Sequence, residues 1–242
     1  LEEKGREPQY DGYVESFTEN WEKLEQYDNN APKTMNAHLH VLEAYTLLYQ
    51  CWKDNGLKKR LEFCVDLFMN RIYDPSRKHF NLFFDNEWNS LVEMDSYGHD
   101  VETGWLLCEA ARTLENQDLI EQTNQLALDV TEACLAEGMS DKGYMIYEKK
   151  GDRKTKHASW WGQIETVIAC VNAWQISGSD VYLQSVDTVW TFVKDHMVDK
   201  EYGEWYSDCF DGEPKKEAPK VSMWRCPYHT VRLGVEMYNR LK

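Results

Sequence analysis

The sequence predicts an all-α fold of stacked helical hairpins with short β-hairpin inserts. Apolar residues recur at steps of three and four, as in Met35, Leu39, Leu42 and Tyr45, which places them on one face of a helix. The order helix, helix, hairpin then repeats, with units that begin near residues 34, 99, 158 and 227. Such units bury their apolar faces only by stacking. A helical repeat array and a toroid both fit, as one domain over 1–242.

The individual elements follow from periodicity and from turn residues. Three glycine-containing pairs are typical of helix C-terminal caps, namely Asn55-Gly56, Glu137-Gly138 and Ser177-Gly178. Stretches that mix aromatic and turn residues indicate short hairpins at 79–91, 143–149 and 201–210. The apolar periodicity predicts helices over residues 35–49, 57–73, 99–114, 118–137, 158–177, 180–198 and 227–241.

Composition narrows the class of partner. The formal net charge is −15, and such a chain repels phosphate backbones and anionic membrane surfaces, so we expect neither nucleic acid nor membrane as a partner. A neutral small molecule is compatible with this charge. The seven cysteines include no C-x-x-C pair, and several lie in apolar helical patterns. We therefore expect buried, reduced thiols and a cytoplasmic location.

The first helix of each repeat carries polar or aromatic groups where an apolar repeat is expected. The members of each pair are three or four residues apart, so they share one helix face. Four such helices could line one cavity at one end of a toroid. The pairs are Asn36 and His40, His99 and Glu102, Trp161 and Glu165, and His229 and Arg232.

Each of these residues also has a purely structural interpretation. His40 could be a core histidine with satisfied nitrogens. Glu102, close behind His99, could simply complement the dipole at a helix N-terminus. Trp161 could belong to the core, and His229 follows Pro227 at a rigid helix start. Spacing therefore predicts a polar cavity and leaves the reaction open.

Several longer sequence words at the same helices resemble the N-acylglucosamine 2-epimerase superfamily, and within it the cellobiose 2-epimerases. The resemblance extends over essentially all of the chain. It implies an (α/α)6 barrel of which about seven of twelve helices are present, so that the chain would be the C-terminal portion and lack the first repeats. The matching words are KTMNAHLHVLEAY from Lys33, SYGHDVETGW from Ser96, WWGQIE from Trp160, GEWY from Gly203 and WRCPYH from Trp224.

The resemblance implies a catalytic group of four residues. His99 and His229 would form an acid–base pair that inverts C2 of the reducing-end sugar of a β-1,4-linked disaccharide, cellobiose to glucosyl-mannose, through a cis-enediol. A histidine suits this step because its ordinary pKa is near neutral. His40 would bind the sugar and polarise an oxygen, and Glu102 would hold the tautomer of His99.

The resemblance also implies a set of substrate contacts. Aromatic rings would stack on pyranose faces, and polar groups would contact hydroxyls. No metal and no organic cofactor are expected, because proton transfer alone performs the chemistry. The expected substrate-binding residues are Trp160, Trp161, Trp224, Asn36, Glu165 and Arg232.

Three other functions stay open. An aldose–ketose isomerase would use the same histidines and return the proton to C1. A glycoside hydrolase would need two carboxylates across the scissile bond, for which Glu102 and Glu165 are available. An inactive sugar-binding fragment would follow from the missing repeats. Alternatively, the expected partner is a second chain that supplies those repeats, or a self-associated form, because an incomplete barrel should expose apolar surface of its inner helices.

Overall fold

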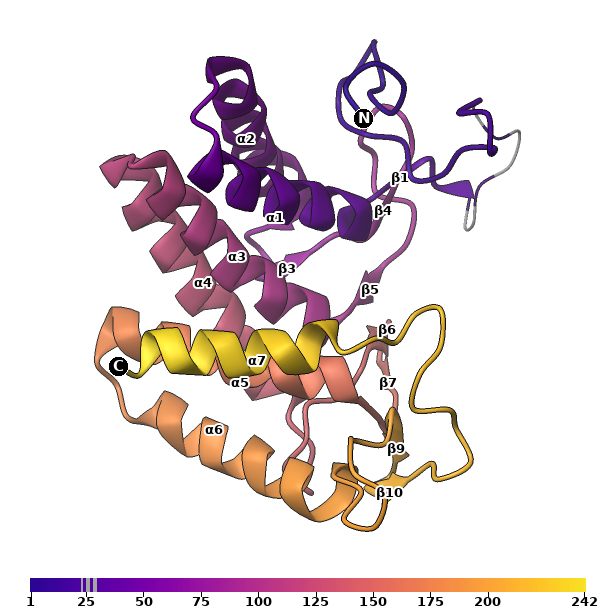
Figure 1. Ribbon diagram of the computed structural model, residues 1–242, viewed down its shortest axis with the longest axis vertical. Coiled ribbons are helices and arrows are strands. Elements are labelled where there is room, and N and C mark those ends of the chain that lie inside the picture. Colours follow the sequence, from indigo (N-terminus) through magenta and orange to yellow (C-terminus); the bar gives the residue numbers. More distant parts are fainter. Residues whose placement is uncertain (23, 25–26, 28–29) are drawn as a thin grey trace. The chain divides into compact units, whose positions relative to one another are not determined.

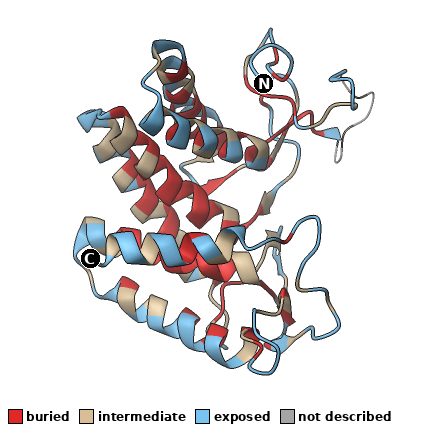
Figure 2. Cartoon of the chain, in the orientation of Figure 1, coloured by how far each residue is buried: buried red, intermediate tan, exposed pale blue. Residues whose placement is uncertain are grey.

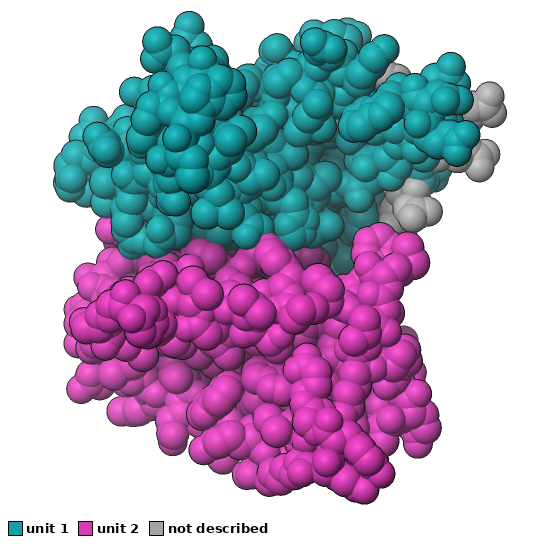
Figure 3. Space-filling model, viewed as in Figure 1, with its two compact units in different colours: residues 1–95, 106–121 teal, residues 96–105, 122–242 magenta. Residues whose placement is uncertain are grey.

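The computed structural model describes residues 1–22, 24, 27 and 30–242 (Figure 1). The chain divides into two compact units, shown in Figure 3. Unit 1 comprises residues 1–95 and 106–121, and unit 2 comprises 96–105 and 122–242. The expectation of a single domain stays a prediction. Seven α-helices lie in the described part of the chain, and the two that span both units are α3 (Tyr97–Leu114) and α4 (Gln117–Gly138).

Unit 1 begins its helical part with α1 (Met35–Cys51) and α2 (Asn55–Leu67), which continues as the π-helical turn η2 (Phe68–Ile72). Thr34 caps α1 by accepting a hydrogen bond from the backbone N–H of Ala37. The expected cap at Asn55-Gly56 is wrong. Asp54 accepts from the N–H of Leu57 and so begins α2 at Asn55, while α1 has already ended.

The predicted hairpin over 79–91 is confirmed only in part, as an antiparallel bridge between Phe84 and Ser90. Strands β3 (His79–Phe80) and β4 (Phe83–Phe84) lie inside this stretch, but each pairs antiparallel with a strand outside it. Strand β3 pairs with β2 (Tyr73–Asp74), and β4 pairs with β1 (Lys33–Thr34). Strand β5 (Met94–Asp95) follows. The pairing of β1 with β4 ties the start of α1 to a segment 50 residues further along the chain.

Unit 2 is built around α5 (Trp160–Ser177). Its residues 162–173 are all buried, because α6 (Val181–Phe192) and α7 (Tyr228–Arg240) both pack against it. Figure 2 shows that buried residues gather in the interior helices and exposed ones on the outer faces. The helix α5 ends at Gly178 in the left-handed conformation (φ 72°), which confirms the expected glycine cap. The π-helical turn η3 (Val193–Met197) extends α6.

Two small sheets complete unit 2. Strands β6 (Lys149–Lys150) and β7 (Arg153–Lys154) form a hairpin. Strands β8 (His157–Ser159), β9 (Asp208–Phe210) and β10 (Glu213–Pro214) form an antiparallel sheet in the order β10-β9-β8. The strands therefore overlap the predicted stretches 143–149 and 201–210 only at their ends. Because β8 leads directly into α5, this sheet sets the position at which α5 begins.

Burial confirms part of the cysteine prediction. Five of the seven cysteines are buried, whereas Cys51 and Cys226 are exposed. In the part of the chain that the structure describes, no helix is long and apolar enough to cross a membrane.

Candidate active site

Six of the predicted site residues lie together in unit 2, within the first two turns of three helices. Helix α3 carries His99 and Glu102, and α7 carries His229 and Arg232. Helix α5 carries Trp161 and Glu165. The side chain of Ser159 caps α5 by accepting from the N–H of Gly162, at 3.2 Å. Three of the four predicted i, i+3 and i, i+4 pairs thus converge on one cluster.

His229 is held by a buried carboxylate. Its Nδ1 lies 2.7 Å from Oε1 of Glu165, whose side chain is fully buried. The other oxygen of Glu165 accepts a hydrogen bond from Nε1 of Trp105 at 2.9 Å. With its proton on Nδ1, the imidazole of His229 donates a hydrogen bond to this carboxylate.

His99 is positioned by a hydroxyl and by an indole. Its Nδ1 lies 2.8 Å from Oγ of Ser96, and its ring centroid lies 4.6 Å from that of Trp161. Gly98 permits this approach, because a Cβ there would lie 2.7 Å from the Trp161 ring. The His229 ring also stacks on Trp161, at 5.7 Å. One indole therefore contacts both imidazoles.

Arg232 joins the two buried carboxylates. Its Nη1 donates to Oε1 of Glu102 at 2.5 Å and to Oε1 of Glu165 at 3.1 Å. The guanidinium also lies over the rings of Tyr228 (4.2 Å) and Trp105 (5.4 Å). Buried carboxylates are costly unless they are paired, and this arginine supplies the opposite charge. The orientation of His99 by Glu102 stays a prediction.

Two carboxylates and one imidazole of this cluster are potential metal ligands. Ligand atoms of Glu102, Glu165 and His229 lie within 4.8 Å of one another. However, Arg232 already donates to one oxygen of each carboxylate, and His229 faces Glu165 through Nδ1. A divalent cation would have to share the carboxylate oxygens with the guanidinium of Arg232, so this cluster fits a metal ion poorly.

The remaining predicted residues are placed differently. Asn36 and His40 share one face of α1 in unit 1, and both are exposed. The alternative that His40 is a core histidine is therefore wrong. Its Nδ1 lies 3.5 Å from Glu43 at the surface. Trp224 is 83% exposed, whereas Trp160 and Trp161 are only partly buried and do not belong to the core.

The buried histidine of α1 is instead His38. Its Nδ1 donates to the carbonyl oxygen of Thr34 at 2.6 Å, and its Nε2 accepts from the N–H of Tyr13 at 2.8 Å. Burial lowers the pKa of His38 to about 4. Both nitrogens thus hold backbone groups, which assigns this histidine to the structure of unit 1.

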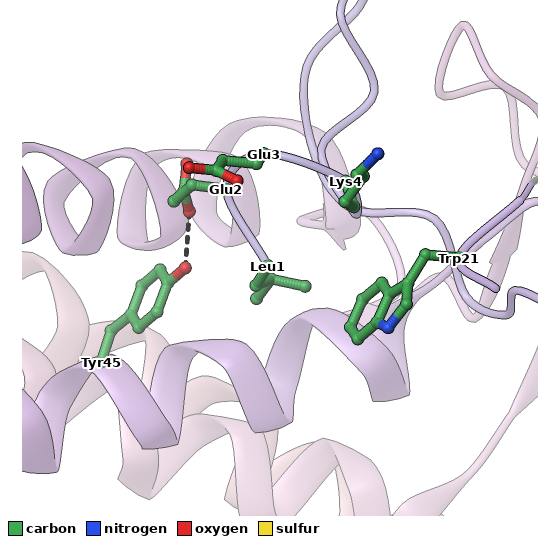
Figure 4. A pocket seen from close by; sticks show the side chains of 6 residues that line it. All are labelled: Leu1, Glu2, Glu3, Lys4, Trp21 and Tyr45. Carbon is green, nitrogen blue, oxygen red and sulfur yellow. Dashed lines mark hydrogen bonds between the residues drawn. The ribbon is translucent and has the colours of Figure 1, made fainter. Parts of the chain in front are cut away.

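Unit 1 also contains a pocket of about 540 Å³. Figure 4 shows Tyr45 donating a hydrogen bond to Glu2 at its edge, at 2.5 Å. Leu1, Glu3, Lys4 and Trp21 complete the lining. This pocket contains none of the predicted site residues.

Sequence reasoning missed three residues of the cluster in unit 2, namely Ser96, Trp105 and Tyr228. A signal existed for Trp105, which follows Glu102 by three residues and so shares its helix face. Ser96 lies before α3, and Tyr228 adjoins His229, so helix spacing could not select them.

The fold and this cluster define a helical-hairpin protein with a histidine and carboxylate site within the first two turns of three of its helices. The chain belongs to the N-acylglucosamine 2-epimerase (GlcNAc 2-epimerase) family, whose model matches residues 1–232.

Individual relatives agree with this family. A cellobiose 2-epimerase of Bacteroides fragilis is 40% identical over 236 residues, covering 93% of this chain and 59% of that protein. A cellobiose 2-epimerase of Dictyoglomus turgidum is 36% identical over 236 residues, covering 95% and 60%. The solved structure of cellobiose 2-epimerase from Bacillus thermoamylovorans matches with a TM-score of 0.94 at 34% identity, covering 99% of this chain and 63% of that chain.

These likenesses settle the fold class. The structural neighbours are (α/α)6 barrels, which confirms the predicted fold and favours the toroid over an open array. Seven helices of such a barrel lie in the described residues. The chain spans about 60% of the length of the curated relatives it matches.

Proposed function

We propose that the protein containing this chain inverts C2 of the reducing-end sugar of a β-1,4-linked disaccharide, converting cellobiose to glucosyl-mannose. The observation that carries this proposal is that the imidazoles of His99 and His229 pack against the same indole, that of Trp161. Two imidazoles so placed can address two faces of one sugar carbon. The names of the relatives supply the substrate.

The chemistry requires only proton transfers. Ring opening exposes an aldehyde, which makes the neighbouring C2–H weakly acidic. One histidine removes this proton, and the electron pair forms the C1–C2 double bond of a cis-enediol as O1 gains a proton. The other histidine then delivers a proton to the opposite face of C2, and the carbonyl reforms at C1 as O1 loses its proton. Proton transfer by a positioned histidine contributes roughly 10²–10⁴-fold to a rate.

The surrounding residues support this cycle. The carboxylate of Glu165 stabilises the imidazolium that forms when His229 takes a proton. Arg232 keeps Glu102 and Glu165 paired and in place. Trp160 and Trp161 offer faces for a sugar ring, and no step requires a metal or an organic cofactor.

Three predicted sugar contacts lie outside the cluster of unit 2. Asn36 and His40 share one face of α1, and Trp224 precedes α7, and all three are exposed. We propose that they contact the sugar in the complete barrel. Because the chain spans about 60% of its relatives, a second chain or self-association that supplies the remaining helices is part of the same proposal.

The test fuses this chain to the part of the B. fragilis relative that it does not match and supplies cellobiose in deuterated water. The expected product is glucosyl-mannose with deuterium at C2, seen by NMR and sugar chromatography. His99→Ala and His229→Ala should each abolish it, while circular dichroism confirms that the variants fold. Turnover retained in either variant would sink the assignment.

Other products would favour the alternatives. A ketose with deuterium at C1 identifies an isomerase, and released glucose identifies a hydrolase. Calorimetry should be done on the fusion and on this chain alone. If both bind cellobiose and neither forms a product, the chain is an inactive sugar-binding fragment.

A further inference from the structure

A basic segment interrupts this acidic chain. Residues 149–156 carry five cations and one acid, although the whole chain has a formal net charge of −15. Most of the segment forms the hairpin of β6 and β7, whose two strands are Lys149–Lys150 and Arg153–Lys154. A local charge of this sign attracts anions over the range of the Debye length, about 8 Å at physiological salt.

The hairpin borders a pocket of about 680 Å³ in unit 2. Four cations line it, and Glu148 is the opposing acid. Lys154 donates to the carbonyl oxygen of Glu137 at 2.6 Å, and Lys156 lies 3.5 Å from Asp211. The other two, Lys150 and Arg153, make no side-chain hydrogen bond or ion pair with the residues that the structure describes. They are therefore available to a ligand.

One wall of the pocket is aromatic. The ring of Phe210 is half exposed and stacks on His157, with centroids 4.7 Å apart and planes 10° apart. His157 is fixed in turn, because its Nε2 lies 2.6 Å from Oδ1 of Asp208. A rigid, exposed ring beside cations suits a ligand that has both an apolar face and a negative charge.

Aromatic contacts connect this wall to the proposed catalytic pair. Tyr147 packs against His157 at 4.7 Å and against Trp161 at 6.0 Å. Trp161 is the indole that contacts both His99 and His229. Burial raises the pKa of Tyr147, so its phenol adds no negative charge to this row.

We propose that this pocket binds the anionic group of an acidic sugar, a saccharide that carries a carboxylate or a phosphate. Lys150 and Arg153 pair with the anion, and Phe210 stacks on the ring that bears it. Binding of the anion at this pocket does not depend on the function proposed above. Its use as a subsite for an acidic substrate rests on the function proposed above, since the aromatic row then carries the saccharide toward the histidines.

Calorimetry and NMR titration of this chain test the site without turnover. The probes are D-glucuronate, D-glucose 6-phosphate, neutral D-glucose and inorganic phosphate. Each sugar anion should bind at least tenfold more tightly than glucose, and the tighter of the two identifies the group that is preferred. Affinity should fall as salt is raised.

The variant K150Q/R153Q should lose at least tenfold in affinity for both sugar anions. The control K58Q/K59Q removes the same charge from α2 in unit 1 and should bind as the unchanged chain does. Equal binding by K150Q/R153Q and the unchanged chain would overturn the proposal, as would inorganic phosphate that binds as tightly as either sugar anion.

Two variants distinguish a failure of the proposed anion site from a failure of the proposed epimerase reaction. His229→Ala should still bind the sugar anions, and K150Q/R153Q in the fusion should still epimerise neutral cellobiose. A fusion that is inactive on cellobiose would remove the proposed reaction and leave the anion site intact.

Discussion

Two histidines, one in each unit, show how surroundings separate a structural role from a chemical one. His38 in unit 1 is fully buried, and both of its nitrogens bind backbone groups. The side chain of His229 in unit 2 is 15% exposed and faces the carboxylate of Glu165 through Nδ1. Burial lowers the pKa of His38 and so favours its neutral imidazole, whereas a neighbouring carboxylate favours the charged form of an imidazole. The contacts of His38 assign it to the stability of unit 1, whereas those of His229 suit the proton transfer proposed for it.

The largest effect should follow from breaking the carboxylate support of His229. Glu165→Gln keeps the shape of the side chain and removes the charge that stabilises an imidazolium. We expect kcat of the fusion on cellobiose to fall about 10²–10³-fold. The exposed Glu121→Gln is the control for loss of one acid. A kcat within threefold of the parent, with the fold intact by circular dichroism, would contradict the role of Glu165.

Removing the buried imidazole should affect folding instead. His38→Ala leaves the N–H of Tyr13 without its acceptor and opens a cavity, so the free energy of unfolding should fall by about 1–3 kcal/mol in urea titrations. His40→Ala, two residues away and exposed, should change it by less than about 0.5 kcal/mol. Equal losses from both variants would show that His38 is no more structural than its neighbour.

The lowered pKa of His38 predicts a pH dependence of stability. The folded state has a pKa of about 4 and the unfolded state about 6.5, so the unfolded state binds more protons between these values. Stability is therefore lost as pH falls from 6.5 to 4, by at most about 1.4 kcal/mol per pH unit. His38→Ala lacks this contribution, so its stability deficit should shrink over this window. A deficit that stays constant from pH 7 to pH 4 would contradict the assignment.

The smallest effect should come from Ser96. Its hydroxyl positions His99 through a neutral hydrogen bond, which is worth less than the carboxylate beside His229. Ser96→Ala should lower kcat about threefold to tenfold and leave KM nearly unchanged. If Ser96→Ala lowers kcat as much as Glu165→Gln does, the hydroxyl beside His99 and the carboxylate beside His229 do not differ in the way proposed.

Much of the fold could be predicted, because helices are specified by local patterns. The periodicity located all seven helices of the described residues, with boundaries shifted by a few residues. The pairing of the strands was harder to predict. Strand β4 lies in a predicted hairpin but pairs with β1, some 50 residues away, and no local pattern encodes a partner at that distance. The pair Asn55-Gly56 does not form the predicted C-terminal cap of the preceding helix. Asp54, one residue earlier, acts as an N-cap, so Asn55 and Gly56 lie in the first turn of α2.

The candidate site was predictable as a set of helix faces but not as a set of contacts. Spacing paired His99 with Glu102 and His229 with Arg232. It could not show that Arg232 reaches Glu102 and Glu165 on two other helices, or that Nδ1 of His229 faces Glu165. In the same way, the net charge of −15 gave no indication that four cations line one pocket of unit 2.

By itself, the sequence determined the helical repeats, their polar pairs and the family resemblance, because backbone geometry converts spacing into faces. Only the tertiary structure decided that His38, and not His40, is buried, and that Trp161 contacts both His99 and His229. A helix pattern states which residues share a face. Which face meets another element depends on long-range packing, and that is a property of the whole folded unit.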